Sequence, residues 1–397
     1  MKIVLISYVM PTPDNFGAGS AHPYHLLKYR PKGIDVVLYT YNTNHVSACD
    51  INGLSKELEL SGVKFLRTPW FFPILFKLKI GFFKNLLPFP FGYYYDIPKS
   101  VVREIEKLHP DGVWIWGDFL PNVAKKFQRY KRVMTLPDSV ALYYHRLMGD
   151  NFLFGSWFKM LANCDQYVKN IKMEKSYPVD DNICFHLVGA ADRDFLKRIN
   201  PRVKAVFIRH PHYNYKEDRI IKFSEPKIKI LIAGKYNLYM KTAFDELLPV
   251  LCSHSELAEH YSITFLGKGW DFAVDKLRAE GYESQQVGFV DVYLDEIIKY
   301  DIQLTPISVG TGTKGKVLDA LSNGLLVIGT PYAMENVAVE DGVSCIEYRS
   351  PGRVVEVLAD MPHRLSLYEQ MAENGRRAVL SEHNREHVSK QFFDLFL

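Results

Sequence analysis

The chain has 397 residues, of which 47% are hydrophobic and 24% are charged, and its formal net charge is +4. A chain of this length fits about two globular domains, each with ample residues for a core. The small net charge gives no general case for nucleic-acid binding, which normally shows a dense basic face, but it permits a local basic site for an anionic ligand.

The five cysteines are far apart and include no C-x-x-C pair, which predicts free thiols in a reducing cytoplasm rather than disulfides or a zinc site. The N-terminal stretch MKIVLISYVM is too short for a secretory signal and predicts a buried strand. No apolar run reaches the ~18 residues of a transmembrane helix, so none is expected.

The first half of the chain alternates strand and helix patterns after a glycine-containing loop that enters a helix at 14–30. Strands are predicted over 2–7, 34–41, 62–70, 111–117, 132–138, 182–189 and 204–210. Helices are predicted over 98–109, 120–130, 139–175 and 190–199. This alternation predicts a parallel sheet with helices on both faces.

Apolar periodicity lapses over 211–226, which predicts an interdomain linker, and then restarts. Strands follow over 227–234, 261–267, 284–290, 301–306 and 325–330, with helices over 241–255, 270–281, 293–300 and 313–324. We therefore expect two Rossmann-like α/β domains, 1–210 and 227–375, facing each other across a ligand cleft. A C-terminal helix is expected over 376–397, with packing against the N-terminal domain as one option.

The segment 308–330, SVGTGTKGKVLDALSNGLLVIGT, is the most informative part of the second domain. Gly310, Gly315 and Lys316 fit the P-loop pattern, but Val317 stands where that motif needs a hydroxyl for Mg²⁺. Small residues allow close backbone approach, and a helix N-terminus with Lys314 and Lys316 attracts phosphate. We interpret the segment as a diphosphate site; the alternative is a glycine-rich turn with solvated lysines.

Asp319 lies one helical turn beyond Lys316. A carboxylate can accept hydrogen bonds from both hydroxyls of a ribose, so phosphate and ribose together indicate a nucleotide. The alternative is an aspartate that only complements the helix dipole.

The run from Gly310 to Ala320, with Gly324, Val327 and Thr330 beyond it, resembles the pattern G-T-G-x-K-x-K-x-L-E-A of the retaining GT-B glycosyltransferases of family 4. The resemblance covers 184–350 well and the N-terminal domain only loosely. The paired glutamates of that family would fall at Thr311 and Asp319, and neither is glutamate here.

The resemblance implies a set of donor-binding positions. These are Lys235, Lys241, Phe289, Val290, Gly310, Thr311, Gly312, Thr313, Lys314, Lys316 and Asp319. The lysines and the helix dipole would stabilise the leaving diphosphate, so neither a metal nor another cofactor is expected. Asp192 and Asp194 form a D-x-D pattern, but they lie at the start of a predicted helix, and Lys241 has the alternative of a solvated lysine.

Acceptor contacts are expected in the first domain. The loop with Gly17, Gly19, Ser20 and His22 resembles the GT-B loop that reaches the acceptor, with a structural turn as the alternative. Asp118 and Asp138 follow predicted strands. Either is a candidate acceptor contact or catalytic base, with Asp138 preferred and helix capping as the alternative. In retaining enzymes of this fold the leaving phosphate is itself commonly invoked as the base.

The segment 67–95 combines aromatic residues and leucines with lysines, and it has no acidic residue. This composition predicts contact with an anionic membrane, whereas the alternative is a buried helix with snorkelling lysines.

The nucleotide-site pattern together with the resemblance predicts a glycosyltransferase that moves a sugar from a nucleotide-sugar to a hydroxyl of a glycan or lipid-linked glycan. By resemblance, the setting is bacterial surface polysaccharide synthesis in the cytoplasm, at the inner face of the plasma membrane. Two alternatives stay open: a nucleotide-sugar epimerase of GT-B fold, and a non-catalytic subunit that binds a nucleotide or glycan.

Overall fold

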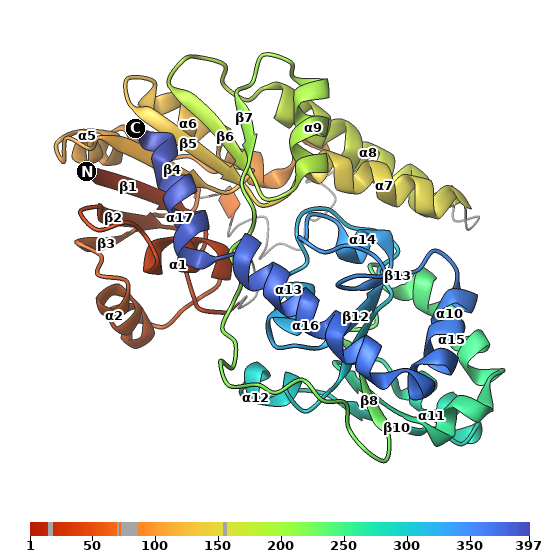
Figure 1. Ribbon diagram of the computed structural model, residues 1–397. Coiled ribbons are helices and arrows are strands. Elements are labelled where there is room, and N and C mark those ends of the chain that lie inside the picture. The colour runs from red at the N-terminus through yellow and green to blue at the C-terminus, as the bar shows by residue number, and fades with distance from the viewer. Residues whose placement is uncertain (15–18, 70, 73–85, 154–156) are drawn as a thin grey trace. The chain divides into compact units, whose positions relative to one another are not determined.

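The computed structural model describes residues 1–14, 19–69, 71–72, 86–153 and 157–397, with only the backbone for 151–153 (Figure 1). Two compact units make up the chain. Unit 1 comprises Met1–Pro211 together with Arg385–Leu397, and unit 2 comprises His212–Asn384.

Unit 1 contains a seven-stranded parallel sheet with helices on both faces. Its strands are β1 (Lys2–Ser7), β2 (Asp35–Thr40), β3 (Gly62–Phe65), β4 (Gly112–Trp116), β5 (Lys131–Leu136), β6 (Ile183–Leu187) and β7 (Ala205–Phe207). Its α-helices are α1 (Ala21–Lys28), α2 (Ala48–Glu57), α5 (Lys99–Glu106), α6 (Pro121–Ala124), α7 (Val140–Leu153), α8 (Trp157–Lys175), α9 (Ala190–Ile199) and α17 (Arg385–Phe393). Short 3₁₀ helices lie at Phe91–Tyr94, Lys125–Phe127 and Asp394–Phe396.

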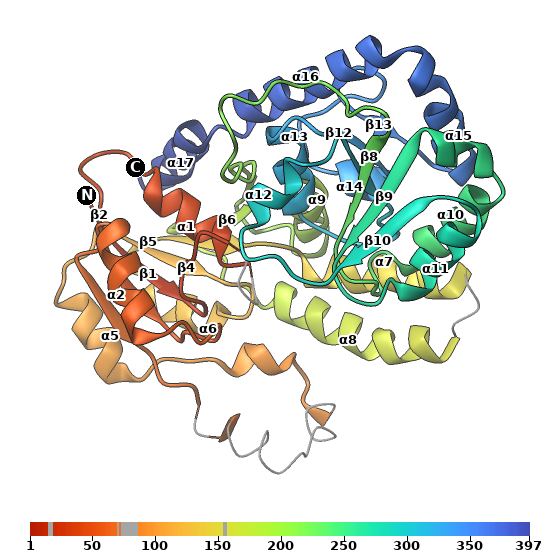
Figure 2. The same cartoon turned by 90° about the horizontal axis from the view of Figure 1, so that it is seen from below.

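The strand order in unit 1 is β3-β2-β1-β4-β5-β6-β7, and every pairing is parallel. Alternate residues of the buried strands face opposite cores. Val4 and Ile6 of β1 pack with residues of α5, α6 and α9, whereas Ile3 and Leu5 pack with residues of α1, α2 and α17. The last helix, α17, thus completes the core beside α1, although the two are far apart in the sequence (Figure 1). Helices α7 and α8 run side by side (Figure 2).

Unit 2 is a second parallel α/β unit. Its strands are β8 (Ile228–Ala233), β9 (Tyr261–Leu266), β10 (Glu283–Val287), β11 (Ile302–Thr305), β12 (Leu326–Gly329) and β13 (Ile346–Glu347). Its α-helices are α10 (Lys241–Cys252), α11 (Asp271–Ala279), α12 (Tyr293–Ile297), α13 (Gly315–Ser322), α14 (Pro331–Met334), α15 (Pro351–Asp360) and α16 (Leu365–Glu382). Ser255–Glu259 and Met361–His363 form 3₁₀ helices.

The strand order in unit 2 is β10-β9-β8-β11-β12-β13, which is the 3-2-1-4-5-6 order of a doubly wound sheet. One core lies between the sheet and α10, α11, α15 and α16, and the other lies under α12, α13 and α14. In both units the strand order reverses direction where the first strand meets the fourth, between β1 and β4 and between β8 and β11. Ligands of such sheets bind beyond the carboxyl ends of the strands at this switch point.

The boundaries between the units differ from the predicted domain limits. The predicted linker 211–226 lies almost wholly in unit 2, because the Arg376 guanidinium donates hydrogen bonds to the carbonyls of Lys216, Glu217 and Arg219 at 2.6, 2.9 and 2.8 Å. Instead of one C-terminal helix from residue 376, the chain forms α16 and α17, which are separated at residues 383–384. The boundary between the two units falls after residue 384, so α16 belongs to unit 2 and α17 belongs to unit 1.

The helix predicted over 120–130 is shorter than expected, because a 3₁₀ turn replaces its second half. The helix α2 was not predicted from the sequence; it has one buried residue, Ile51, and therefore no clear apolar face. The predicted helical region 139–175 is divided into α7 and α8.

Candidate functional site

The glycine-rich segment of unit 2 lies at the predicted position, between the carboxyl end of β11 and the start of α13. It is hydrogen-bonded to the other loop at the switch point, since Ser308 N and Oγ donate to the Tyr239 carbonyl at 2.8 and 3.1 Å. The two loops that leave β8 and β11 are therefore held together at the edge of the sheet where a ligand is expected.

Glycine is favoured at three positions of this segment, either by the backbone conformation or by a neighbouring side chain. Gly312 has a φ of +63°, which disfavours other residues. A Cβ at Gly310 would lie 3.0 Å from Cε of Lys314, and a Cβ at Gly315 would lie 2.9 Å from the Tyr213 ring. At Gly310 and Gly315, the space that glycine leaves is therefore filled by side chains of unit 2 itself.

The two lysines of the loop have different surroundings. Lys314 donates from Nζ to the carbonyls of Thr311 and Gly312 at 2.7 and 3.0 Å. Lys316, in the first turn of α13, extends toward the loop after β8, where a Cβ on Gly234 would lie 3.2 Å from its Nζ. Gly234 also has a φ of +134°, so a residue with a side chain would be strained there by its backbone conformation.

Lys316 is exposed to solvent, yet its Nζ lies close to the backbone at Gly234. Its pKa is lowered from the ordinary value, chiefly because desolvation disfavours the charged form and further because the Lys235 ammonium is close. Asp319 acts in the opposite direction. Two cations and one carboxylate thus lie near one another at the switch point of unit 2, and an anion placed beside the two ammonium groups would relieve their repulsion.

Val317 is fully buried in the core under α13. Its burial explains why an apolar residue follows Lys316 where a P-loop has a hydroxyl. Gln303 also contacts the first turn of α13, since its side-chain amide donates a hydrogen bond to the Lys316 carbonyl at 3.1 Å.

Lys241 lies at the start of α10 in a local network. Its ammonium donates to Asp245 at 2.5 Å and to the Tyr236 hydroxyl at 2.9 Å, and that hydroxyl also donates to Asp245. A neighbouring carboxylate thus already balances the charge of Lys241, whereas Lys235 and Lys316 lie beside each other.

Phe289 and Val290 follow β10 in unit 2. The Phe289 side chain is 80% exposed, whereas Val290 packs on the core beneath α13. Sequence reasoning missed Tyr293 of α12. Its hydroxyl finds no hydrogen-bond partner among the described residues, and the Asp319 carboxylate adds to the burial that raises its pKa. Tyr293 is half-buried and its hydroxyl is fully buried near Asp319, so it is a further candidate for contact with a polar ligand.

In unit 1, three neighbouring strands carry polar residues just after their carboxyl ends: Tyr8 after β1, Asp118 after β4 and Asp138 after β5. Burial raises the pKa of Tyr8 most, followed by the charges of Asp118 and Asp138. The ring of Tyr8 stacks on Trp116 with 5.0 Å between ring centroids. Tyr8 was not singled out from the sequence, although its place directly after the first strand was a usable signal.

Asp118 is 6% exposed, and no hydrogen-bond partner for its Oδ2 exists in the part of the chain that the structure describes. Its pKa is raised to about 7. Burial is the largest cause, backbone hydrogen bonds at Asp118 and Phe119 counteract it, and the Asp138 carboxylate raises it further. A carboxyl group with a pKa near neutrality can both accept and donate a proton.

The residue after Asp138 belongs to a buried carboxylate network. Glu174 accepts hydrogen bonds from Ser139 Oγ at 2.9 Å and from the Ala141 N–H at 3.0 Å, and Asp192 accepts from the Ser139 N–H at 2.9 Å. Burial is the main reason that the pKa of Glu174 is raised to about 8. Asp192 thus fixes the turn after β5.

Among the described residues, no group of three or more His, Cys, Asp or Glu side chains is arranged to hold a metal ion.

The predicted acceptor loop is only partly described, and Gly17 lies outside the described residues. Gly19 lies beside the Trp116 ring, since a Cβ there would be 3.7 Å from it. Ser20 is fully buried and accepts a hydrogen bond from Thr12 Oγ1 at 2.6 Å. His22 is 3% exposed, and its Nδ1 accepts from the Trp116 indole at 3.3 Å. Ser20 and His22 therefore pack inside unit 1, next to β4.

The aromatic-basic segment 67–95 is also described only in part, because residues 70 and 73–85 lie outside the described residues. In the described part, Phe72 is buried, with its ring centroid 4.1 Å from that of Phe91 and 4.9 Å from that of Tyr95. No helix in the described part of the chain is long and apolar enough to cross a membrane.

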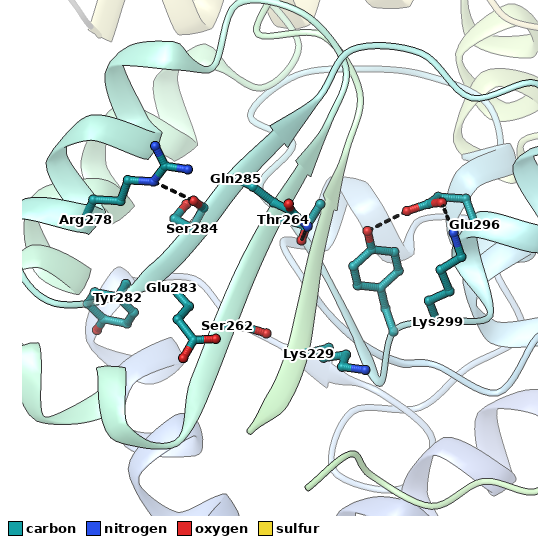
Figure 3. Close-up of a pocket in the computed structure, with 11 residues that line it drawn as sticks. Lys229, Ser262, Thr264, Arg278, Tyr282, Glu283, Ser284, Gln285, Glu296 and Lys299 are labelled. Atoms are coloured by element: carbon teal, nitrogen blue, oxygen red, sulfur yellow. Dashed lines mark hydrogen bonds and ion pairs between the residues drawn. The ribbon is translucent and has the colours of Figure 1, made fainter. Parts of the chain in front are cut away.

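A hollow of about 610 Å³ lies elsewhere in unit 2, on the side of the sheet that holds Lys229, Ser262 and Thr264 (Figure 3). It overlies the first halves of β8 and β9 and therefore does not coincide with the switch point. Its charged groups are in part paired, as Glu296 accepts from Lys299 at 2.6 Å and from the Tyr300 hydroxyl at 2.7 Å (Figure 3). We assign no ligand to this hollow.

The sequence matches no protein-family model. It also matches no curated protein.

The structure, in contrast, is similar over its whole length to solved structures. Anabaena HepE in complex with UDP-glucose superposes with a TM-score of 0.61 at 10% identity, over 99% of this chain and 98% of that chain. Sucrose-phosphate synthase from Thermosynechococcus elongatus gives 0.64 at 11% identity, over 100% and 98%. WaaG, a glycosyltransferase involved in lipopolysaccharide biosynthesis, gives 0.60 at 12%, over 99% of each chain. The chain therefore has the GT-B fold, with two parallel-sheet α/β domains.

Proposed function

We propose that the protein is a glycosyltransferase that takes a sugar from a nucleotide-sugar and transfers it to a hydroxyl of a glycan acceptor. The observation that carries the proposal is the pair of cations at the switch point of unit 2, where the Lys316 ammonium lies against Gly234 and beside Lys235. Negative charge grows on the leaving diphosphate as the bond to the sugar breaks. Fixed cations at that place stabilise the charge without reorganisation.

The fold supports this proposal, because its solved neighbours include a complex with UDP-glucose and an enzyme of lipopolysaccharide biosynthesis. Asp319 would accept hydrogen bonds from the ribose hydroxyls, with Tyr293 as a donor beside it. The sequence resemblance adds the expectation that the anomeric configuration is retained, which NMR of the product would check.

For the acceptor, we propose that the carboxylates at the edge of unit 1 contact the attacking hydroxyl. Asp118 is the better candidate base in the structure, since its buried Oδ2 has no partner among the described residues and its pKa of about 7 suits proton transfer at neutral pH. This choice reverses the preference for Asp138 in the sequence analysis.

The acceptor is proposed to be a glycan or lipid-linked glycan of bacterial surface polysaccharide synthesis, reached at the cytoplasmic face of an anionic membrane. The aromatic-basic composition of 67–95 supports this part. Co-sedimentation with anionic and with neutral vesicles at low salt tests it, and equal lack of binding to both would contradict membrane contact.

The decisive experiment is a thermal-shift screen of UDP-, GDP- and dTDP-sugars, because a ligand that binds only the native state stabilises it by mass action. We expect one nucleotide class to raise the melting temperature and then to release nucleoside diphosphate when acceptor glycans are added. No shift with any of the three would contradict the donor site. Release of diphosphate that does not depend on acceptor would contradict transfer.

A further inference from the structure

Lys314 is directed into its own loop. Its Nζ lies 2.7 Å from the Thr311 carbonyl and 3.0 Å from the Gly312 carbonyl, and its aliphatic chain occupies the space beside Gly310. From the sequence, Lys314 and Lys316 are predicted to bind phosphate in the same way. In the structure, Lys316 is the one of these two lysines that extends toward the loop after β8.

A second donor converges on the same carbonyl from a different part of unit 2. Asn336 follows α14, and its amide Nδ2 donates to the Gly312 carbonyl at 3.0 Å. Asn336 has a φ of +68°, a conformation that asparagine adopts more readily than most residues. The residue type at 336 thus suits both the backbone there and the bond to the glycine-rich loop.

Holding these carbonyls has a consequence for the peptide N–H groups of the loop. In a planar trans peptide the C=O and the following N–H point in opposite directions. Donors on the Thr311 and Gly312 carbonyls therefore turn the N–H groups of Gly312 and Thr313 away from the Lys314 ammonium. Successive backbone N–H groups that face one way form a concave site for anions.

We propose that Lys314 and Asn336 are positioning residues that hold the glycine-rich loop in its phosphate-binding shape, and that Lys314 does not contact the phosphate itself. The proposal rests on the proposed function, because it names how the donor loop is held. The direct cationic contacts then belong to Lys316 and Lys235.

A double-mutant cycle on nucleotide affinity tests this. Lys314→Met removes the ammonium and keeps the chain length, and Asn336→Gly removes the amide while tolerating the positive φ. If both residues act through the Gly312 carbonyl, each single substitution weakens binding of the preferred nucleoside diphosphate by about ten-fold. The double variant should then bind less than about three-fold more weakly than the single variant with the lower affinity. Isothermal titration calorimetry measures the three affinities.

The matched control is Asn374→Ala, which removes an amide-to-carbonyl hydrogen bond of 2.9 Å to Val343 elsewhere in unit 2 and should leave the affinity unchanged. Melting temperatures of the ligand-free variants should stay within about 2 °C of the parent, since the lost bonds are local and near the surface. A larger fall in melting temperature would mean a structural role and would overturn the proposal.

Losses that simply add, to about a hundred-fold in the double variant, would overturn the proposal, because Lys314 would then act on the phosphate independently. Unchanged affinity in either single variant would also overturn it. The proposed function fails differently: the unmodified protein would then bind none of UDP, GDP and dTDP, and the positioning proposal would fall with it.

Discussion

At the switch point of unit 2, the glycine-containing loops after β8 and β11 lie with the cations Lys235 and Lys316, the latter in the first turn of α13. The strand ends of unit 1 instead carry Tyr8, Asp118 and Asp138. The two sheets share the same order of their first six strands, so the fold brings loops together at equivalent edges in both units. The chemistry differs because the loop residues differ. We propose that the edge of unit 2 binds negative charge, whereas the edge of unit 1 holds Asp118, a carboxyl group whose pKa is raised to about 7.

The largest expected effect comes from removing the cation that defines the edge of unit 2. Lys316→Met keeps an unbranched side chain of similar length but removes the charged Nζ that lies next to Gly234. We expect the turnover rate with saturating donor to fall by about 100- to 1,000-fold, as with the loss of one electrostatic donor in other active sites. Steady-state assays of nucleoside diphosphate release measure it.

The matched control is Lys276→Met on α11, which removes an exposed lysine of the same unit far from the switch point in the sequence. Equal losses in the two variants would mean that net charge matters rather than the position of Lys316.

On the edge of unit 1, Asp118→Asn keeps the side-chain shape and removes the proton acceptor. We expect kcat/KM at pH 8 to fall by about 100-fold. The parent protein should gain transferase activity as the pH rises through the Asp118 pKa of about 7, because only the ionised carboxylate accepts a proton. Asp118→Asn should lose this limb of the pH profile, and a variant that retained it would show that another group is the base.

The same substitution should raise stability. The pKa of Asp118 is raised from 3.8 to about 7 in the folded protein, so between these values the native state binds a proton that the unfolded chain has released. The unfolding free energy therefore falls as the pH rises through this window and stays lower above it. Asp118→Asn removes that cost, and urea unfolding at pH 8 should show a gain of about 1–3 kcal/mol. At pH 4 the difference should nearly vanish.

The contrast between the edges was only partly predictable from the sequence. The alternation of strand and helix patterns predicted the parallel sheets, and the place of the glycine-lysine segment followed from that order. The direction in which each lysine side chain extends did not follow from the sequence, because it depends on where the carbonyls of the loop lie. Those positions depend in turn on backbone angles such as the φ of +63° at Gly312. Ser20 and His22 looked like loop residues, but α1 begins at Ala21 and places both in the core.

A smaller effect is expected at Asp319, the carboxylate that counteracts the lowering of the Lys316 pKa. If it binds ribose, Asp319→Ala should weaken nucleoside diphosphate binding by about ten-fold, and Asp319→Glu should recover most of that loss, because a charge-assisted hydrogen bond is restored. The parent protein should prefer a ribonucleotide to its 2′,3′-dideoxy analogue, and Asp319→Ala should not. An unchanged preference would leave Asp319 as a partner of the Lys316 charge only.

The smallest effect is expected from metal removal, and it bears directly on what the cationic edge does. A divalent ion in other transferases neutralises the leaving diphosphate, and here Lys316 and Lys235 are proposed to supply that charge. Chelation with EDTA should therefore change the rate by less than about two-fold, since no catalytic charge is lost. Added Mg²⁺ should not rescue Lys316→Met. If chelation reduced the rate of the parent protein by about ten-fold or more and Mg²⁺ restored it, the two ammonium groups would not be sufficient for the leaving group.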